Sequence, residues 1–436
     1  MERVIITTGG TGGHIFPALA LAEELLRRNP RVMILFMGGR LGPEADLAMQ
    51  AGLDFVGLPV SGFLGRGFRA LPAAFGMGRA IFKAMGVLRK VQPEIVVGFG
   101  GYAAFAGVMA GRLGGRATAI HEQNAFPGMA NRWLSRYVDR IFLSVPDASG
   151  AFAPEKSCLV GNPVRAGIVE LHQRRLAALA AEEDRSGGLT LAEAGPEMGA
   201  EAGPETGPEA RAEGPEPAVA VDRPEAPGLA DEAGRSDGAT MPPLAPARPR
   251  PRLLVMGGSQ GAAAINDGLL KAMGPLLERG LEIWHQTGQA DYDRVRAAYR
   301  EAAAELVRVE PFITDMPRAY AWADLVLCRA GASTLAELCA VGLPALLTPF
   351  PYAAQDHQTY NARFLERQGA AVLLEQEAFA EASGGSEVLA RAVLDLAFDR
   401  GRLEEMGRKS LALARPRAAA DLADGLEELL AQKRMD

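Results

Sequence analysis

The two halves of the chain open in the same way, and this repeat constrains the fold more than any other feature. In each half a short apolar stretch runs into a glycine pair, a small polar residue, a further glycine and then a helical pattern; the copies begin at Ile5 and Leu253. A buried strand, a glycine-rich turn and a helix form the opening unit of a nucleotide-binding α/β domain. The repeat therefore predicts two related Rossmann-like domains.

Short β-branched runs alternate with helical stretches along both halves, which favours parallel sheets. The predicted strands are residues 4–7, 32–37, 54–58, 95–98, 118–121, 140–144 and 158–160, and then 253–256, 281–285, 306–309, 325–328, 345–348 and 371–374. The clearest helix covers residues 16–26, with Pro17 suited to its first turn. We expect an α/β protein whose two doubly wound parallel-sheet domains, residues 1–165 and 252–415, face each other across a cleft.

The segment between these domains has a different composition. Residues 176–251 hold 12 of the 29 prolines and no aromatic residue, isoleucine or cysteine, and Gly-Pro-Glu recurs four times. Such a segment buries too little apolar surface to offset the entropy of ordering it. We predict a disordered insert without a catalytic role. After it and the second domain, residues 416–436 form an amphipathic helix; in two-domain folds of this kind such a helix often crosses back onto the first domain, which the sequence leaves open.

Composition excludes several classes of protein. A net charge of -7 argues against a general nucleic-acid binder. The three cysteines lie far apart, so no disulfide framework is expected. The N-terminus runs directly into a strand pattern rather than a signal peptide. Since no window offers about 18 uninterrupted apolar residues, any membrane contact is expected to be peripheral.

The first glycine-rich loop, residues 8–14 (Thr-Gly-Gly-Thr-Gly-Gly-His), links a predicted strand to a helix start. Unpaired N–H groups and the helix dipole favour an anion there. A Walker A loop is excluded because no lysine follows the glycines. A dinucleotide fingerprint is disfavoured by Ile15, where a small residue is required, and by Arg40, where an acid should end the second strand.

Further polar or glycine-rich segments follow other predicted strands. They are residues 98–102 (Gly-Phe-Gly-Gly-Tyr), 121–124 (His-Glu-Gln-Asn), 257–261 (Gly-Gly-Ser-Gln-Gly), 329–337 (Arg-Ala-Gly-Ala-Ser-Thr-Leu-Ala-Glu) and 349–358. Strand ends in doubly wound sheets are where ligands bind. Two such loops in the first half predict a site wide enough for a diphosphate. The loop at 329–337 suits the diphosphate of a second ligand, with Glu337 placed to accept ribose hydroxyls. Asp291-Tyr292-Asp293 imitates a metal-binding DxD motif but starts a helix, and no cluster has metal-ligand spacing.

In this order, and together with residues 161–165 (Gly-Asn-Pro-Val-Arg), these motifs resemble the MurG family of glycosyltransferases across the whole chain except 176–251. The resemblance implies a GT-B fold and inverting transfer of N-acetylglucosamine (GlcNAc) from UDP-GlcNAc to C4 of the muramyl sugar of lipid I, undecaprenyl-diphosphoryl-MurNAc-pentapeptide. The product is lipid II, which serves peptidoglycan synthesis and hence cell shape and division. The resemblance implies no cofactor and no required metal, and other cell-wall synthesis proteins as further partners.

The family's functional positions are carried over residue by residue. Donor contacts are expected at Thr11, Gly12, Gly13, Asn124, Arg165, Ser259, Ile313, Ala332, Ser333, Thr334, Leu335, Ala336, Glu337 and Gln358. The acceptor diphosphate is expected at Gly12, Gly13, Gly100, Gly101 and Tyr102. The chain departs from the family in its long insert and in Thr359, where a second glutamine is common.

Inversion by direct displacement requires a base on the acceptor hydroxyl. His14 is the first choice, Glu122 the second, and His121 is the expected orienting residue; the sequence does not decide between the two candidate bases. Departure of UDP without a metal requires charge stabilisation, which we expect from the helix start at Ser333 and Thr334 and from Arg165.

A basic, apolar segment at 63–90 contains no acidic residue. Its predicted membrane-binding patch comprises Leu71, Phe75, Arg79, Phe82 and Lys83. Such a segment fits an interfacial anchor on anionic lipid, and the expected location is the cytoplasmic face of the inner membrane.

Three alternatives remain at this stage. A UDP-sugar epimerase of the same fold needs neither a lipid acceptor nor a membrane patch. A non-catalytic subunit that binds a lipid diphosphate would not keep a complete donor loop ending in Glu337. A nicotinamide enzyme is disfavoured by Ile15 and Arg40.

Overall fold

The structure is a computed structural model. It describes residues 1–10, 12–40, 42–60, 70–186, 250–257, 262–302, 305–353, 356–380 and 385–435. Most of the predicted insert, along with Thr11 and Ser259, therefore lies outside the described residues.

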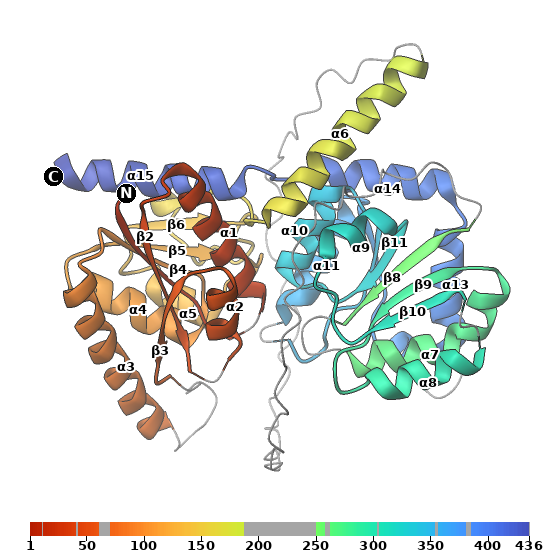
Figure 1. Cartoon of the computed structure of the whole chain (residues 1–436), viewed down its shortest axis with the longest axis horizontal. Coiled ribbons are helices and arrows are strands. Elements are labelled where there is room, and N and C mark those ends of the chain that lie inside the picture. The colour runs from red at the N-terminus through yellow and green to blue at the C-terminus, as the bar shows by residue number, and fades with distance from the viewer. Residues whose placement is uncertain are drawn as a thin grey trace. The chain divides into compact units, whose positions relative to one another are not determined.

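The first sheet has seven parallel strands in the order β3-β2-β1-β4-β5-β6-β7 (Figure 1). They are β1 (Arg3–Thr7), β2 (Met33–Gly39), β3 (Asp54–Leu58), β4 (Ile95–Gly98), β5 (Ala117–Glu122), β6 (Arg140–Leu143) and β7 (Ser157–Leu159). The helices between and after them are α1 (Gly12–Arg28), α2 (Glu44–Gln50), α3 (Ala70–Val91), α4 (Gly101–Leu113), α5 (Met129–Leu134) and α6 (Ala166–Ser186).

The second sheet has six parallel strands in the order β10-β9-β8-β11-β12-β13. They are β8 (Arg252–Met256), β9 (Glu282–Gln286), β10 (Val307–Glu310), β11 (Leu325–Cys328), β12 (Ala345–Leu347) and β13 (Ala371–Leu373). The accompanying helices are α7 (Ala263–Glu278), α8 (Tyr292–Ala302), α9 (Met316–Trp322), α10 (Ala332–Val341), α11 (His357–Arg367), α12 (Glu377–Ala380), α13 (Gly385–Ala397), α14 (Arg400–Ala412) and α15 (Ala418–Met435).

The central strands of both sheets, β1 and β4 in the first and β8 and β11 in the second, are buried on two faces, which explains why they are almost continuously apolar. In β1, Val4 and Ile6 pack with α1 on one face, whereas Ile5 packs with α3 and α4 on the other. The strand order reverses between β1 and β4 and again between β8 and β11. Ligands of doubly wound sheets bind outside the carboxyl ends of the strands at such switch points. The predicted loops after β1, β4 and β11 start at this edge, whereas the loop after β8 lies outside the described residues from 258 to 261.

Helix α1 differs from the prediction at its start. It begins at Gly12 rather than at residue 16, so Pro17 lies inside the helix and not in its first turn. Proline has no N–H to donate to the carbonyl four residues earlier. The carbonyl of Gly13 is therefore left without its helical partner and is available to a group outside the helix.

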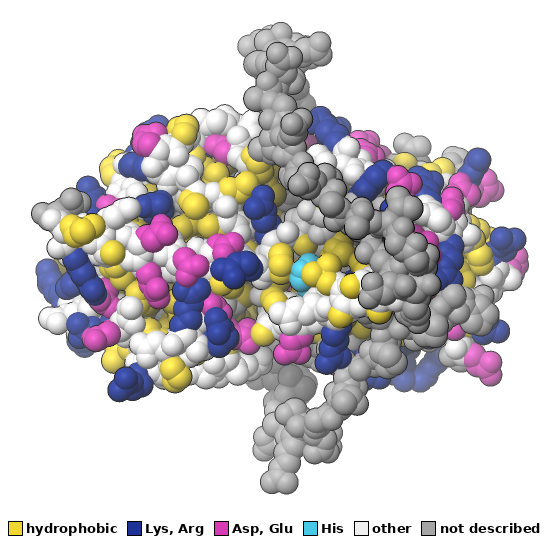
Figure 2. Space-filling view, turned by 90° about the horizontal axis from the view of Figure 1, so that it is seen from above, with side chains coloured by type: hydrophobic (Ala, Val, Ile, Leu, Met, Phe, Trp, Pro, Cys, Tyr) yellow, Lys and Arg dark blue, Asp and Glu magenta, His cyan; other side chains and the backbone are white. Residues whose placement is uncertain are grey.

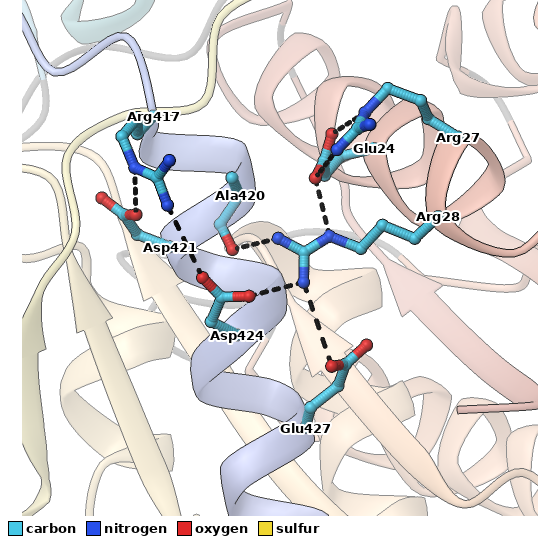
Figure 3. Close-up of polar contacts among 8 residues, drawn as sticks. All are labelled: Glu24, Arg27, Arg28, Arg417, Ala420, Asp421, Asp424 and Glu427. Carbon is cyan, nitrogen blue, oxygen red and sulfur yellow. Dashed lines mark hydrogen bonds and ion pairs between the residues drawn. The ribbon is translucent and has the colours of Figure 1, made fainter.

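Helix α15 completes the core of the first sheet domain. Leu422, Ala423, Leu426, Leu429 and Leu430 are buried in one cluster with residues of β1, β2 and α1. Figure 3 shows the polar edge of this contact, where Arg28 of α1 donates to the carbonyl of Ala420 (2.9 Å) and pairs with Asp424. Because exposed ion pairs contribute little, the apolar contacts are the main source of stability here.

The surface has no strong preference for one charge on the side that carries α15. Figure 2 shows Lys and Arg side chains interspersed with Asp and Glu over the described part of this face. Across the described residues, no helix has the length and apolar character needed to span a bilayer.

Candidate functional site

The two glycine-rich loops of the first domain are joined by their backbones. Gly9 N–H donates to the Gly100 carbonyl at 3.1 Å. Gly101 has φ +81°, and a Cβ there would lie 2.4 Å from the Gly9 carbonyl oxygen, so only glycine permits this approach. Helix α4 starts beside this contact, and its N-cap residue Gly100 provides no side-chain cap. The contact therefore places the starts of α1 and α4 side by side, and backbone N–H groups at helix starts are a favourable environment for an anion.

Glu44 holds the first loop and was missed by sequence reasoning. Its buried Oε1 accepts from Gly10 N–H at 3.0 Å and, at 3.4 Å, from Gly39 N–H. Gly10 N–H is thus already bonded within the protein, so anion binding must rely on the amides that begin α1. A lone glutamate in a polar turn gave no signal for this contact in the sequence.

His14, Gln123 and His121 form a chain of hydrogen bonds. His14 Nδ1 lies 2.7 Å from Gln123 Oε1, and Gln123 Nε2 lies 3.0 Å from His121 Nδ1. His121 Nε2 lies 3.0 Å from the Gly161 carbonyl oxygen. Burial lowers the pKa of His121 to about 4, so this imidazole is neutral at physiological pH. The structure therefore brings the predicted base and orienting residue together, with Gln123 between them.

The structure favours a different role for Glu122, the second candidate base. Its Oε1 accepts from the backbone N–H groups of Gln123 and Asn124 and from the Asn124 side chain, while Oε2 accepts from Gly128 N–H and Asn131 Nδ2. These five contacts, at 2.9 to 3.1 Å, engage both oxygens of a side chain that is only 2% exposed. We interpret Glu122 as the organiser of the loop after β5, because neither oxygen is free to take a proton from substrate.

The donor loop of the second domain meets the first domain at Ser333. Helix α10 begins at Ala332, and its N-cap Gly331 provides no side-chain cap. Ser333 Oγ donates to the Gly13 carbonyl at 2.9 Å, the carbonyl that Pro17 leaves unpaired. Ser333 and Thr334 are half-buried, and Leu335 and the Glu337 side chain point into the protein. The starts of α1 and α10 thus face a common site.

Glu337 and Arg165, both predicted to contact UDP-GlcNAc, form an ion pair between the domains. Arg165 donates through Nε and Nη2 to Glu337 Oε1 at 3.0 and 2.7 Å, and its guanidinium lies over the Phe16 ring. Tyr320, which sequence reasoning missed, donates to Glu337 Oε2 at 2.9 Å. Burial, together with Glu337, raises the pKa of Tyr320, so the hydroxyl stays a donor. Both carboxylate oxygens of Glu337 are therefore held in place by hydrogen bonds from other side chains.

Asn361 links the loop after β5 to the second domain. Its Nδ2 donates to Asn124 Oδ1 (3.2 Å) and its Oδ1 accepts from Ala125 N–H (3.2 Å). Asn361 lies one helical turn after Gln358, a spacing that could have drawn attention to it. Gln358 itself accepts from Phe350 N–H at 2.9 Å and fixes the loop before α11.

Ile313 is buried, and its N–H is bonded to Gln286 Oε1 at 3.0 Å. Gln286 ends β9 and is a further residue that sequence reasoning missed. The residue predicted to lie near the uracil is therefore held in place by its neighbour in the sheet.

A cavity of about 600 Å³, its open mouth included, lies where these elements meet. It is lined from both domains, by Gln123 and Asn162 on one side and by Ala332, Ala336 and Asn361 on the other. Within the described residues, no group of three or more His, Cys, Asp or Glu side chains is arranged to hold a metal ion.

Two buried histidines make stability sensitive to acid. Burial lowers the pKa of His121 to about 4 and that of His285 to about 3, against about 6.5 in the unfolded chain. As the pH falls below 6.5, the unfolded chain therefore binds a proton at each of the two histidines, whereas the native protein does not. The stability that is present above pH 6.5 is consequently lost as the pH falls. We expect the free energy of unfolding to fall by about 2 to 3 kcal/mol between pH 6 and pH 5. Urea unfolding at each pH measures this, and His285→Asn should roughly halve the slope; an equal slope would contradict the assignment.

The glycosyltransferase family 28 N-terminal domain matches residues 4–143, and the family 28 C-terminal domain matches residues 252–424. A transferase of Nitratidesulfovibrio vulgaris (strain Hildenborough) is 50% identical over 99% of this chain and 98% of its own length. It is named UDP-N-acetylglucosamine–N-acetylmuramyl-(pentapeptide) pyrophosphoryl-undecaprenol N-acetylglucosamine transferase. The crystal structure of Acinetobacter baumannii MurG is 29% identical, with a TM-score of 0.67 over 98% of this chain and 100% of that one.

The chain belongs to the MurG family, within glycosyltransferase family 28. The predicted GT-B fold with two Rossmann-like parallel-sheet domains is confirmed. A UDP-N-acetylglucosamine 2-epimerase shares the fold, with a TM-score of 0.59 over 100% of this chain and 98% of that one, but only 13% identity. The fold alone therefore does not separate the transferase from the epimerase, whereas the family membership does.

Proposed function

We propose that this chain transfers GlcNAc from UDP-GlcNAc to C4 of the muramyl sugar of lipid I, giving lipid II for peptidoglycan synthesis. The observation that carries the proposal is the meeting of two domains at one site. In the first domain the starts of α1 and α4 lie next to each other. In the second domain the start of α10 contacts the start of α1, because Ser333 Oγ donates a hydrogen bond to the Gly13 carbonyl. The name of the relative that is 50% identical over almost the whole chain supports the same reaction.

In the proposed reaction His14 is the catalytic base. The C4 hydroxyl oxygen of the acceptor attacks the anomeric carbon of GlcNAc, and the bond from that carbon to the β-phosphate oxygen of UDP breaks. The hydroxyl proton passes to the imidazole of His14. Attack from the face opposite the leaving group inverts the anomeric carbon. Position supports this role, since His14 lies in the first turn of α1 beside the glycine loops proposed for the acceptor diphosphate.

Departing UDP gains negative charge, which the second domain is built to stabilise. The uncapped start of α10 presents backbone N–H groups, and its dipole favours an anion. Arg165 adds a positive charge held over Phe16. Glu337, oriented by Arg165 and Tyr320, is the proposed acceptor for the ribose hydroxyls.

A direct assay tests the proposal. Purified protein is incubated with radiolabelled UDP-GlcNAc and a lipid I analogue in detergent, with and without EDTA. Label entering the lipid fraction in both samples supports the transfer and its independence of added metal. UDP-ManNAc formed without acceptor would instead indicate the epimerase.

We also propose that the acceptor is met at the cytoplasmic face of the inner membrane through α3. Phe75 and Phe82 lie two helical turns apart and are 72% and 74% exposed, with Arg79 exposed between them. Exposed aromatic and cationic side chains on one helix fit the interface of an anionic bilayer. Lys83 is held differently: its ammonium donates to the Gly57 carbonyl and lies against β3. Leu71 lies in the first turn of α3, and its side chain is outside the described part.

Charge reversal tests this patch. The double variant Phe75→Glu with Phe82→Glu is expected to lower the partition coefficient onto anionic phospholipid vesicles at least about 10-fold at low salt, because it removes apolar burial and adds repulsion. Vesicle sedimentation measures the change. A matched double variant of exposed residues elsewhere, Met49→Glu with Val388→Glu, should bind nearly as wild type does. Equal losses in both double variants would show that net charge, and not the α3 patch, governs binding.

A further inference from the structure

The hydrogen bonds that connect His121, Gln123 and His14 have a defined direction, which starts at a backbone carbonyl. The Gly161 carbonyl oxygen can only accept, so His121 Nε2 must carry its hydrogen at this 3.0 Å contact. Gly161 has φ +93°, and a Cβ there would lie 2.4 Å from Arg415 Cβ, so the position of this carbonyl depends on glycine. A neutral His121 with its hydrogen on Nε2 has a lone pair on Nδ1.

The orientation of the Gln123 amide follows from two acceptors. Its Nε2 lies 3.0 Å from His121 Nδ1 and 3.1 Å from the His121 carbonyl oxygen. Both groups accept, so the amide nitrogen must be the atom that faces them, and each of its hydrogens has a partner. Gln123 is only 2% exposed, and a different orientation of its amide would break the hydrogen bonds to His121 and His14.

The amide oxygen of Gln123 fixes the tautomer of His14. Gln123 Oε1 lies 2.7 Å from His14 Nδ1 and can only accept, so His14 carries a hydrogen on Nδ1. In a neutral imidazole the other nitrogen is then unprotonated. His14 Nε2 is therefore the nitrogen left to take a proton from a substrate.

We infer that Gln123 is a positioning residue. The Gly161 carbonyl fixes the tautomer of His121, His121 fixes the orientation of the Gln123 amide, and the amide oxygen holds the hydrogen of His14 on Nδ1. His14 Nε2 is thereby kept free to act as a base. The inference rests on the proposed function, in which His14 is the base. In this arrangement buried His121 orients Gln123 by accepting a hydrogen bond on Nδ1. His121 must be neutral to do so, because a protonated imidazole has no acceptor atom. Gln123 needs both a donor and an acceptor at one end of its side chain, and a carboxylate or an aliphatic group lacks this combination.

The test measures the tautomer of His14 and the rate separately. The chain has five histidines, so ¹⁵N-histidine labelling gives a spectrum simple enough to assign with His14→Asn. At a pH where His14 is neutral, wild type should show the hydrogen on Nδ1. In Gln123→Leu this hydrogen is expected to move largely to Nε2, and kcat with UDP-GlcNAc and the lipid I analogue is expected to fall by about 10- to 100-fold. KM for UDP-GlcNAc should change less than about threefold.

Two further variants separate the inference from general damage to β5. Thr118→Val removes a buried hydrogen bond to Asp139 (3.0 Å) from the same strand and lies outside the chain of bonds, so it should leave the His14 tautomer and kcat unchanged. Gln123→Glu keeps the acceptor for His14 but loses both hydrogens, so it should retain the Nδ1 hydrogen on His14 and lose the link to His121. An unchanged tautomer in Gln123→Leu overturns the inference whatever the rate does. A changed tautomer at full kcat would refute the role of His14 as base, and the catalytic part of the inference with it.

Discussion

Replacing His14 with asparagine is expected to lower kcat for GlcNAc transfer by about 100- to 10,000-fold, the range typical for loss of a general base. Asparagine keeps a polar side chain near Gln123 but cannot accept a proton at neutral pH. Because His14 acts on the acceptor hydroxyl, KM for UDP-GlcNAc should stay within about threefold of wild type. Steady-state kinetics at saturating lipid I analogue measure both constants.

His172→Asn is the matched control for this experiment. His172 is a buried histidine of α6 whose Nδ1 lies 2.6 Å from the Ala340 carbonyl, and it is outside the site. Its replacement should leave kcat within about twofold. If His14→Asn keeps more than a tenth of wild-type kcat while its melting temperature and UDP affinity are normal, another group must remove the proton.

Replacing Glu337 with glutamine is expected to weaken UDP binding by about 10- to 100-fold. Hydrogen bonds to a charged group contribute about 1.5 to 3 kcal/mol each, and the amide offers the ribose hydroxyls one neutral oxygen in place of a carboxylate. The variant also replaces the ion pair with Arg165 by at most a neutral hydrogen bond, so the oxygen offered to the ribose is held less firmly. Isothermal titration with UDP measures the affinity directly and does not depend on the chemical step.

Glu282→Gln is the control for Glu337→Gln. Glu282 of β9 forms an ion pair with Arg252 of β8 at 3.0 Å. The pair lies outside the site, so UDP affinity should not change. Wild-type affinity in Glu337→Gln would refute its role in holding the ribose and leave the pair with Arg165 as a contact between domains only.

The sequence predicted the sheets well because their strands are buried on both faces. Runs such as 4–7 and 253–256 are almost entirely apolar and lead into a glycine pair, and the structure places β1 and β8 there within one residue. The start of α1 was misplaced because glycine is a poor helix former in a helix interior. At a helix start, however, the first N–H groups have no helical partner, and glycine leaves those of Gly12 and Gly13 unobstructed by a side chain, as the proposed diphosphate site requires.

The site was less predictable, because its side chains are held by partners from distant parts of the chain. Arg165 and Glu337 were each singled out, but their pairing spans 172 residues and no local pattern encodes it. Glu44, Tyr320, Gln286 and Asn361 were missed for the same reason. Gln123 stood inside a recognised polar motif, yet its role appears only when the three hydrogen bonds around it are seen together.

The place of α15 bears on how the protein acquires its fold. Leu422, Leu426 and Leu429 belong to the same buried cluster as Val4 and Ile15, although the whole second sheet domain lies between them in the sequence. A fragment that ends near residue 165 would expose the apolar face of α1 that these leucines cover. The N-terminal half is therefore incomplete as a folding unit, and its final packing has to wait until α15 has been synthesised.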